Sequence, residues 1–176
     1  MKTEIKIPEG ITVSVKDNIV QVKGPKGSIE KEFKSKVVSI KLENKEIVLE
    51  STNTRRKVLS ILYTTQSIIE NLISGVQKKY TYTLRGVYSH FPISLTMKGK
   101  TFIISNYLGE KNPRTIEILD NVEVNIKGKD VIVTSVDKEK AGIVAGMIEN
   151  NAKVLNKDRR TFQDGVYIVS KGVQNE

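Results

Sequence analysis

The residues in this sequence that are best suited to chemistry are cations grouped with amides and aromatic rings. The densest group is the run of residues 153–167, in which lysine, arginine, asparagine, glutamine, phenylalanine and tyrosine alternate. Such a mixture can bind a folded RNA through its phosphates, its 2′-hydroxyls and its bases. The same composition would also suit a solvated loop whose Phe162 and Tyr167 fold back into the core. The candidate RNA-binding residues of this run are Lys153, Asn156, Lys157, Arg159, Arg160, Phe162, Gln163 and Tyr167.

A second group of cations, Arg55, Arg56 and Lys57, falls in the predicted first turn of a helix. Cations at this end oppose the helix dipole at a cost of roughly 0.3 kcal/mol each, so nothing within the helix favours them there. A phosphate bound at the same end would reverse the sign of this effect. We therefore favour a contact with nucleic acid or another partner, and neutralisation by Glu50 and other local acids is the alternative.

The weaker candidates are two basic turns and one histidine. Lys23 and Lys26 belong to a Lys-Gly-Pro-Lys-Gly turn, whose glycines would let backbone amides approach a phosphate. An ordinary hairpin with solvated lysines is an equal alternative. Lys98 and Lys100 flank a glycine and are interpreted as the equivalent turn in the second half of the chain. His90 is either a packed residue or an RNA contact.

Enzymatic chemistry finds little support in the sequence. The chain has no cysteine and a single histidine, which excludes thiolate metal sites, a histidine metal cluster and a cysteine nucleophile. Neither a P-loop nor a dinucleotide-binding glycine motif is present. Acidic residues are scattered singly, without a pair that their spacing would bring together. We expect no catalytic role, no cofactor and no small-molecule substrate.

The balance of charge points to a polyanionic partner. Lysine and arginine number 29 against 20 acidic residues, for a formal net charge of +9. Such a surplus favours nucleic acid through phosphate neutralisation and counterion release. No apolar run reaches the roughly 20 residues that span a bilayer, and the N-terminal residues do not resemble a signal peptide. We therefore expect a cytoplasmic protein without a membrane partner.

The secondary-structure elements that would position these residues are predicted as two copies of one pattern along the chain. Residues 15–27 match residues 97–109 in pattern at an offset of 82, and residues 40–51 match residues 124–135 at an offset of 84. Each copy begins with short runs rich in valine and isoleucine, separated by turn signals, which predict antiparallel hairpins.

Each set of strands is followed by one predicted helix. Apolar residues recur every three or four positions over residues 58–73 and 141–152, as on the buried face of a helix. Ser, Thr or Asn at positions 51–53 is expected to cap the first helix, and Asp137 the second. We predict an α+β fold made by tandem duplication of a small antiparallel sheet with one helix on one face. The predicted domains are residues 1–82 and 83–176, the second carrying the basic loop and a C-terminal strand.

Four stretches of the chain, in order, carry a resemblance to a known family. They are residues 22–27, 87–92, 136–140 and 156–168, and the last is the most specific. In these stretches the chain resembles the universal large-subunit ribosomal protein number six, in the archaeal and eukaryotic branch in which the eukaryotic name is number nine.

The resemblance implies a structural protein of the large ribosomal subunit. It implies binding to large-subunit rRNA near the sarcin–ricin loop, beside neighbouring ribosomal proteins and close to where translation factors dock. It makes residues 153–167 a main RNA-contacting element and Lys98, Lys100 and His90 weaker ones. The bacterial branch has a run of glycine and lysine where this chain has residues 159–165, so bacterial contacts do not transfer there. The alternative is a non-ribosomal RNA-binding protein or a ribosome-biogenesis factor.

Overall fold

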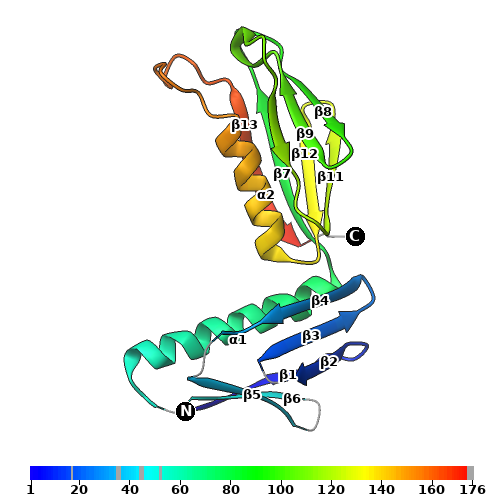
Figure 1. The fold of residues 1–176 in the computed structure, drawn as a ribbon, viewed down its shortest axis with the longest axis vertical. Helices are drawn as coiled ribbons and strands as arrows, with labels where there is room; N and C mark the ends of the chain where they lie inside the picture. The colour runs from blue at the N-terminus through cyan, green and yellow to red at the C-terminus, as the bar shows by residue number, and fades with distance from the viewer. Residues whose placement is uncertain (17, 35–36, 44–45, 52, 174–176) are drawn as a thin grey trace. The chain divides into compact units, whose positions relative to one another are not determined.

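The chain forms two compact units that are contiguous in sequence, Met1–Lys79 and Tyr80–Glu176 (Figure 1). The structure is a computed structural model, and it describes residues 1–16, 18–34, 37–43, 46–51 and 53–173. Each unit combines small antiparallel sheets with one longer helix. This arrangement confirms the predicted α+β class. Within the described residues, no helix combines the length and the apolar character needed to cross a membrane.

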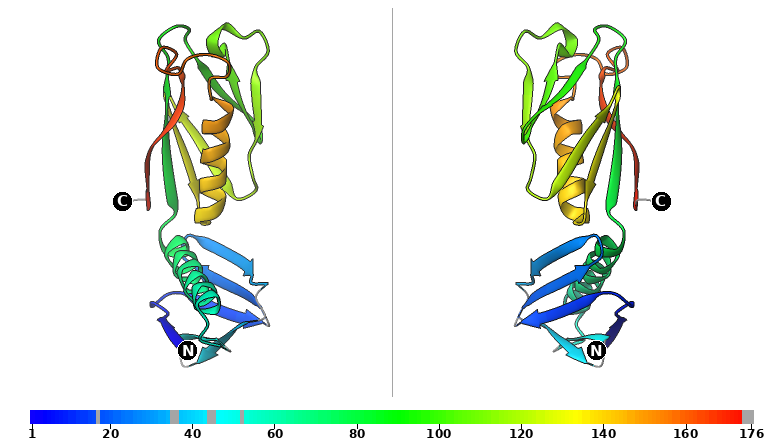
Figure 2. Two further views of the ribbon diagram at one scale, coloured as in Figure 1. Left: turned by 90° about the vertical axis from the view of Figure 1, so that its left-hand side faces the viewer. Right: turned by 90° about the vertical axis from the view of Figure 1, so that its right-hand side faces the viewer.

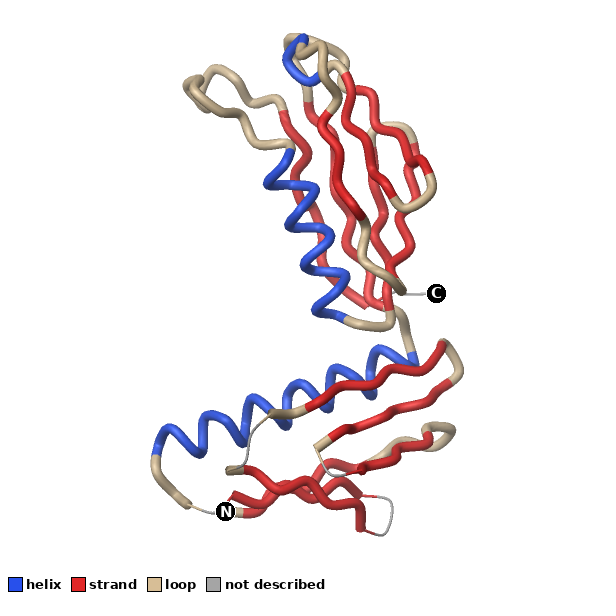
Figure 3. The backbone as a smooth tube through the Cα atoms, viewed as in Figure 1, coloured by secondary structure: helices blue, strands red, loops and turns tan. Residues whose placement is uncertain are grey.

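The first unit has two three-stranded sheets and one helix (Figure 3). The strand orders are β1-β6-β5 and β2-β3-β4, and every neighbouring pair is antiparallel. The helix α1 lies against β3 and β6. The elements are β1 (Lys2–Lys6), β2 (Thr12–Lys16), β3 (Ile19–Gly24), β4 (Gly27–Glu32), β5 (Val38–Glu43), β6 (Glu46–Ser51) and α1 (Arg56–Gln77).

The core of the first unit follows from the two periodicities in its sequence. Alternate residues of β3, Val20 and Val22, are fully buried, because side chains of a strand point alternately to its two faces. On α1 the buried residues recur every three or four positions, as the apolar stripe predicts. They are Leu62, Thr65, Ile69, Leu72, Ile73, Gly75 and Val76.

Gly24 lets the β3–β4 turn approach the end of α1. The Lys26 backbone N–H donates to the Val76 carbonyl oxygen at 3.0 Å. A Cβ on Gly24 would lie 2.8 Å from Val76 Cγ2 and 2.9 Å from that carbonyl oxygen. The sequence predicts that the glycines of this turn bring backbone amides to a phosphate. The backbone amide of Lys26 instead donates to the Val76 carbonyl oxygen within the protein.

Gly24→Ala is expected to destabilise the first unit by about 1–3 kcal/mol, because backbone must move to admit the methyl group. Calorimetry of the full chain measures this as a lower melting temperature for one transition. Gly146→Ala is the matched control, since a Cβ there meets nothing within 4 Å. In a helix interior it is expected to stabilise by up to about 1 kcal/mol. Equal melting temperatures for the wild type and Gly24→Ala would contradict the close-approach argument.

The second unit has a three-stranded and a four-stranded sheet, with strand orders β10-β9-β8 and β11-β12-β7-β13. The helix α2 covers one face of the larger sheet and packs on β7, β12 and β13 (Figure 2). The elements are β7 (Tyr80–Val87), β8 (Ser94–Lys98), β9 (Thr101–Ser105), the 3₁₀ turn η1 (Tyr107–Gly109), β10 (Arg114–Glu117), β11 (Val122–Lys127), β12 (Asp130–Ser135), α2 (Lys138–Asn151) and β13 (Gly165–Val173).

The predicted duplication is confirmed, with β13 as the one strand of the second unit that has no counterpart among the described residues of the first. Strands β2 and β3 recur as β8 and β9, and β5 and β6 recur as β11 and β12, at the offsets read from the sequence. Besides β5, strand β6 pairs antiparallel with β1, and β12 pairs in the same way with β7 besides β11. One predicted equivalence is wrong. The turn at Lys98 and Lys100 joins β8 to β9 and corresponds to the β2–β3 turn, whereas Lys23 and Lys26 flank the β3–β4 turn.

The two helices begin differently. Asp137 caps α2 as predicted, because its Oδ1 accepts from the backbone N–H groups of Glu139 at 2.8 Å and Lys140 at 3.4 Å. The N-cap of α1 is Arg55, and no side chain among the described residues caps that end. The predicted cap by Ser51 or Asn53 is therefore wrong, and Thr52 lies outside the described residues. The asymmetry leaves three cations at a helix start that lacks a side-chain acceptor.

Candidate RNA-binding surface

The predicted main site is the loop that joins α2 to β13, residues 152–164, which we call the basic loop (Figure 1). It extends beyond the end of α2, at the end of the second unit where β7 also finishes. Six of the candidate residues in this region have exposed side chains, and Phe162 and Tyr167 are half-buried. The exposed candidates are Lys153, Asn156, Lys157, Arg159, Arg160 and Gln163.

Phe162 was open to two interpretations, a base-stacking residue and a core residue, and it fits neither fully. Its ring stacks on the His90 ring, with centroids 4.6 Å apart and an interplanar angle of 21°. Lys157 Nζ lies 4.4 Å from the centroid of the same ring. Phe162 is thus used to hold the basic loop against residues near the end of β7, and it is neither a fully buried core residue nor a free stacking surface.

The tip of the basic loop is a turn ordered by Asp158. Its carbonyl oxygen accepts from the backbone N–H groups of Thr161 at 3.1 Å and Phe162 at 2.9 Å. Its carboxylate faces the Arg160 guanidinium, with Oδ2 2.9 Å from Nη2, and this hydrogen bond lowers the pKa of Asp158. Because the Arg160 side chain is 91% exposed, the pair is weak and Arg160 can exchange Asp158 for a phosphate.

The basic loop ends on a buried carboxylate. Asp164 is 1% exposed and accepts hydrogen bonds from the backbone N–H groups of Ser89 at 3.0 Å and His90 at 3.2 Å. His90 Nδ1 lies 2.7 Å from its Oδ2, and Ser89 Oγ donates to the same oxygen at 3.3 Å. Burial alone would raise the pKa of Asp164, but these hydrogen bonds outweigh burial and lower it to about 2. One face of His90 and its Nδ1 are therefore used within the protein.

A second buried contact holds the start of the basic loop. The Tyr107 hydroxyl lies 2.6 Å from the Ala152 carbonyl oxygen and 3.0 Å from that of Asp164, and burial raises the pKa of Tyr107 to about 12. The Arg114 guanidinium lies 4.1 Å from the centroid of the Tyr107 ring. Arg114 Nη1 donates to the Asn151 carbonyl oxygen at 2.6 Å, where α2 ends. None of these roles was predicted from the sequence.

The remaining candidates of the second unit are exposed at the β8–β9 turn. Gly99, between Lys98 and Lys100, has φ of +59°, which explains a glycine at this position. Lys100 pairs with the Asp120 carboxylate, whose hydrogen bond raises the pKa of Lys100. Lys98 is exposed. Binding of a phosphate by Lys100 would therefore require it to leave Asp120.

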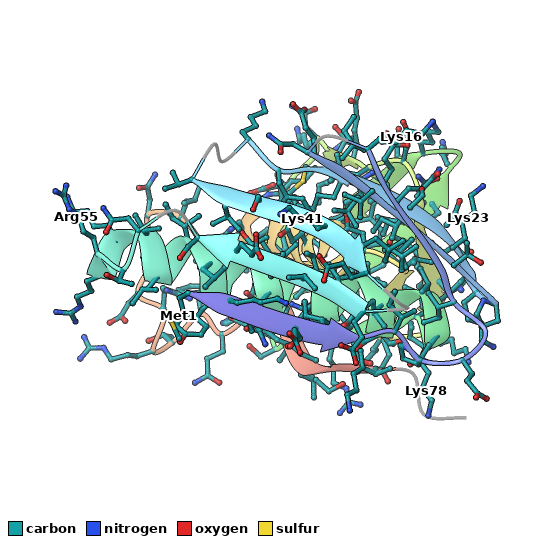
Figure 4. The ribbon with its side chains drawn as sticks, turned by 90° about the horizontal axis from the view of Figure 1, so that it is seen from below. Met1, Lys16, Lys23, Lys41, Arg55 and Lys78 are labelled. Atoms are coloured by element: carbon teal, nitrogen blue, oxygen red, sulfur yellow. The ribbon has the colours of Figure 1, made fainter. Side chains whose placement is uncertain are left out.

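The candidates of the first unit form separate groups. Figure 4 places Arg55 and Lys23 at opposite ends of this unit. Arg55, Arg56 and Lys57 are exposed, and the first turn of α1 contains no acidic residue. Glu50, the acid expected to neutralise them in the alternative interpretation, pairs instead with Lys41 at 3.0 Å.

Arg55→Asp is expected to stabilise the first unit by about 1 kcal/mol, because it supplies an N-cap acceptor and replaces a cation at the positive end of the helix dipole. Urea unfolding, followed by hydrogen exchange of α1, measures the change. Lys34→Asp makes the same change of charge at an exposed position outside α1 and is expected to have little effect. A lower stability for Arg55→Asp would contradict the dipole argument.

No described residues bring three or more His, Asp or Glu side chains together as a metal site. The candidate cations lie at the basic loop, at the two turns and at the start of α1, and other exposed lysines, such as Lys6, Lys16 and Lys34, lie outside these groups. This distribution suits a polyanionic surface that contacts the chain at several points.

Comparisons with known proteins identify similar chains. The family model described as Ribosomal protein L6 matches residues 7–79 and 91–165. A relative from Aeropyrum pernix, named large ribosomal subunit protein uL6, is 43% identical over 170 residues, which is 96% of this chain and 93% of the relative. Relatives of the same name are 40% identical in Saccharolobus solfataricus and 38% identical in Methanosarcina mazei. They cover 98% and 95% of this chain, and 96% and 95% of their own lengths.

Proposed function

Because this chain belongs to the ribosomal protein L6 family, we propose that it is a component of the large ribosomal subunit that binds rRNA near the sarcin–ricin loop. The family consists of structural ribosomal proteins, in agreement with the prediction that the chain is not an enzyme. The similarity to archaeal relatives makes this chain of the archaeal type. Its proposed location is the cytoplasmic ribosome.

The observation that carries the proposal is similarity along nearly the whole chain, in both units. The exposed cations of the basic loop support its RNA-binding part, because rRNA presents a dense array of phosphates. The contacts of Phe162 and Asp164 give that loop a defined conformation, which suits recognition of a folded RNA by shape.

We propose that the RNA-contacting side chains are foremost Lys153, Lys157, Arg159 and Arg160. The cations at the start of α1 and at the two turns would make additional phosphate contacts. Neighbouring ribosomal proteins would be further partners, and translation factors would dock nearby.

The test is sedimentation of the tagged chain with large subunits through a high-salt wash, followed by binding to transcribed rRNA fragments. The expected result is that the chain remains with mature subunits and prefers a fragment that contains the sarcin–ricin loop. Release by the wash, or presence only on immature particles, would favour the alternative of a biogenesis factor. Equal affinity for fragments with and without the sarcin–ricin loop would reject that binding site.

A further inference from the structure

We propose that His90, Tyr107, Arg114 and Asp164 form a clasp that orders the basic loop before RNA binds, so that they are positioning residues and not RNA contacts. This inference rests on the proposed function, and it reassigns His90 from a candidate contact to a support. The four side chains come from segments that are far apart in the sequence, and each of them contacts the basic loop or its two ends.

Three segments meet at the same end of the second unit (Figures 2 and 3). They are residues 88–92 after β7, residues 106–114 from the end of β9 to the first residue of β10, and residues 151–164 from the last residue of α2 to the start of β13. Asn106 Nδ2 donates to the Pro92 carbonyl oxygen at 3.1 Å, which joins the first two segments. His90 joins the first to the third, and Tyr107 joins the second to the third. The hydrogen bonds therefore connect every pair of segments.

Asp164 fixes the end of the basic loop with little freedom to rearrange. Its carboxylate is buried and accepts four hydrogen bonds, from the backbone and side chains of Ser89 and His90. Moving this carboxylate would leave a buried charge without partners, which is strongly unfavourable. The His90 ring stacks on Phe162, so the same histidine holds two residues of the loop.

Arg114 and Tyr107 fix the start of the basic loop. The last carbonyl groups of a helix lack partners within the helix, and Arg114 Nη1 donates to that of Asn151, the last residue of α2, at 2.6 Å. It also donates to the carbonyl oxygen of Lys153 in the basic loop at 3.1 Å. Glu110 holds the guanidinium in place, with Oε2 2.8 Å from Nε. The Tyr107 hydroxyl shares its one proton between the carbonyl oxygens of Ala152 and Asp164, the first and last residues of the loop, and so favours keeping the two ends together.

The segment that carries Tyr107 also has an unusual backbone. Leu108 has φ of +50°, a conformation that residues with a branched side chain rarely adopt, and Asn106 has φ of +57°. Such a backbone persists only where surrounding contacts hold it. The contacts of Asn106 and Tyr107 with the neighbouring segments supply that constraint, so the segment is shaped around its contacts with the loop.

Ordering the loop in advance matters for a loop of long cationic side chains. Fixing a flexible segment at the moment of binding reduces affinity, because the cost in conformational entropy is subtracted from the interaction energy. With both ends and Phe162 already held, the arginines of the tip are presented from one backbone conformation. The clasp thus contributes to RNA affinity without contributing charge.

Two substitutions that each remove one negative charge distinguish ordering of the basic loop from attraction of RNA by net charge alone. Asp164→Asn and Glu117→Gln each make the second unit more positive by one charge, so an electrostatic account predicts tighter RNA binding for both. We expect Asp164→Asn to weaken binding to a transcribed large-subunit rRNA fragment by about tenfold. Glu117→Gln should bind as tightly as the wild type or more tightly, because Glu117 is an exposed residue of β10 outside the basic loop. The salt dependence of binding should be nearly the same in all three, because every cation is retained.

Tyr107→Phe tests the clasp without a change of charge and keeps the buried ring. It is expected to speed hydrogen exchange of residues 153–163 and to weaken RNA binding severalfold. Tyr63→Phe removes an exposed hydroxyl from the first unit and is the matched control. If Asp164→Asn fails to fold, Tyr107→Phe decides the matter alone.

The clasp is rejected if Tyr107→Phe leaves both loop exchange and RNA affinity at wild-type values, or if Asp164→Asn binds RNA as tightly as Glu117→Gln. In that case wild-type binding to the rRNA fragment would still support the proposed function. Absence of wild-type binding would reject the proposed function, and the RNA role of the clasp with it.

Discussion

Replacing both Arg159 and Arg160 by alanine is expected to weaken rRNA binding and to flatten its salt dependence, by about one unit of log slope for each phosphate that the loop no longer neutralises. Both side chains are exposed at the tip of the basic loop. Arg160 also has to leave Asp158 to reach a phosphate, so its net contribution is smaller than that of an unpaired arginine. Filter binding to a large-subunit rRNA fragment at a series of salt concentrations measures the slope.

The control for this double variant removes two exposed lysines from the first unit, Lys6 and Lys16, which are not among the candidate residues. It lowers the net charge by the same amount. If the slope depended on net charge alone, the two double variants would behave alike. An unchanged slope for the arginine variant would exclude the tip of the loop as a phosphate-binding element.

The second large effect is expected in acid, at Asp164. Its pKa is about 2 in the folded chain, whereas an unfolded aspartate titrates near ~3.9. The folded state therefore favours the ionised carboxylate. Its contribution to stability is complete above about pH 4 and disappears as the pH falls toward 2.

Asp164→Asn is therefore expected to cost on the order of 2 kcal/mol at pH 7 and much less at pH 2. The free energy of unfolding of the second unit, taken from hydrogen exchange of β7 and β12 or from urea titrations at several pH values, measures this difference. Asp158→Asn is the control for stability, because it removes a carboxylate from an exposed pair. Its free energy of unfolding should differ little from that of the wild type at any pH. If the loss of unfolding free energy caused by Asp164→Asn stays constant from pH 7 to pH 2, the pKa argument is contradicted.

The repeated fold could be predicted because each of its signals is local. Alternating valines in β3 and the apolar stripe of α1 each fix a buried face, and the offsets of 82 and 84 relate the strands of the two copies. The failures also have local causes. The polar residues at positions 51–53 predict a cap for α1, but the helix begins at Arg56 without a side-chain cap among the described residues. The two basic turns looked alike in composition, although they join different strand pairs.

The candidate site was only partly accessible from the sequence. Cations in a polar run indicate an exposed loop, and the structure exposes the cations of residues 153–160. The clasp depends on contacts between distant residues, and a single sequence does not reveal such pairs. His90 and Asp164 are separated by 74 positions, and Tyr107 and Asp164 by 57. The one sequence signal for Asp164 was its position immediately before the apolar strand β13, which is a weak signal without knowledge of its partners.

The most direct test of RNA binding by this basic, duplicated chain is an electron cryo-microscopy map of the large subunit that contains it. The expected result is that the basic loop lies on rRNA, with Lys157, Arg159 or Arg160 within about 4 Å of phosphate oxygens. The result that would contradict the account is an intact subunit in which these side chains face bulk solvent and no phosphate lies near them.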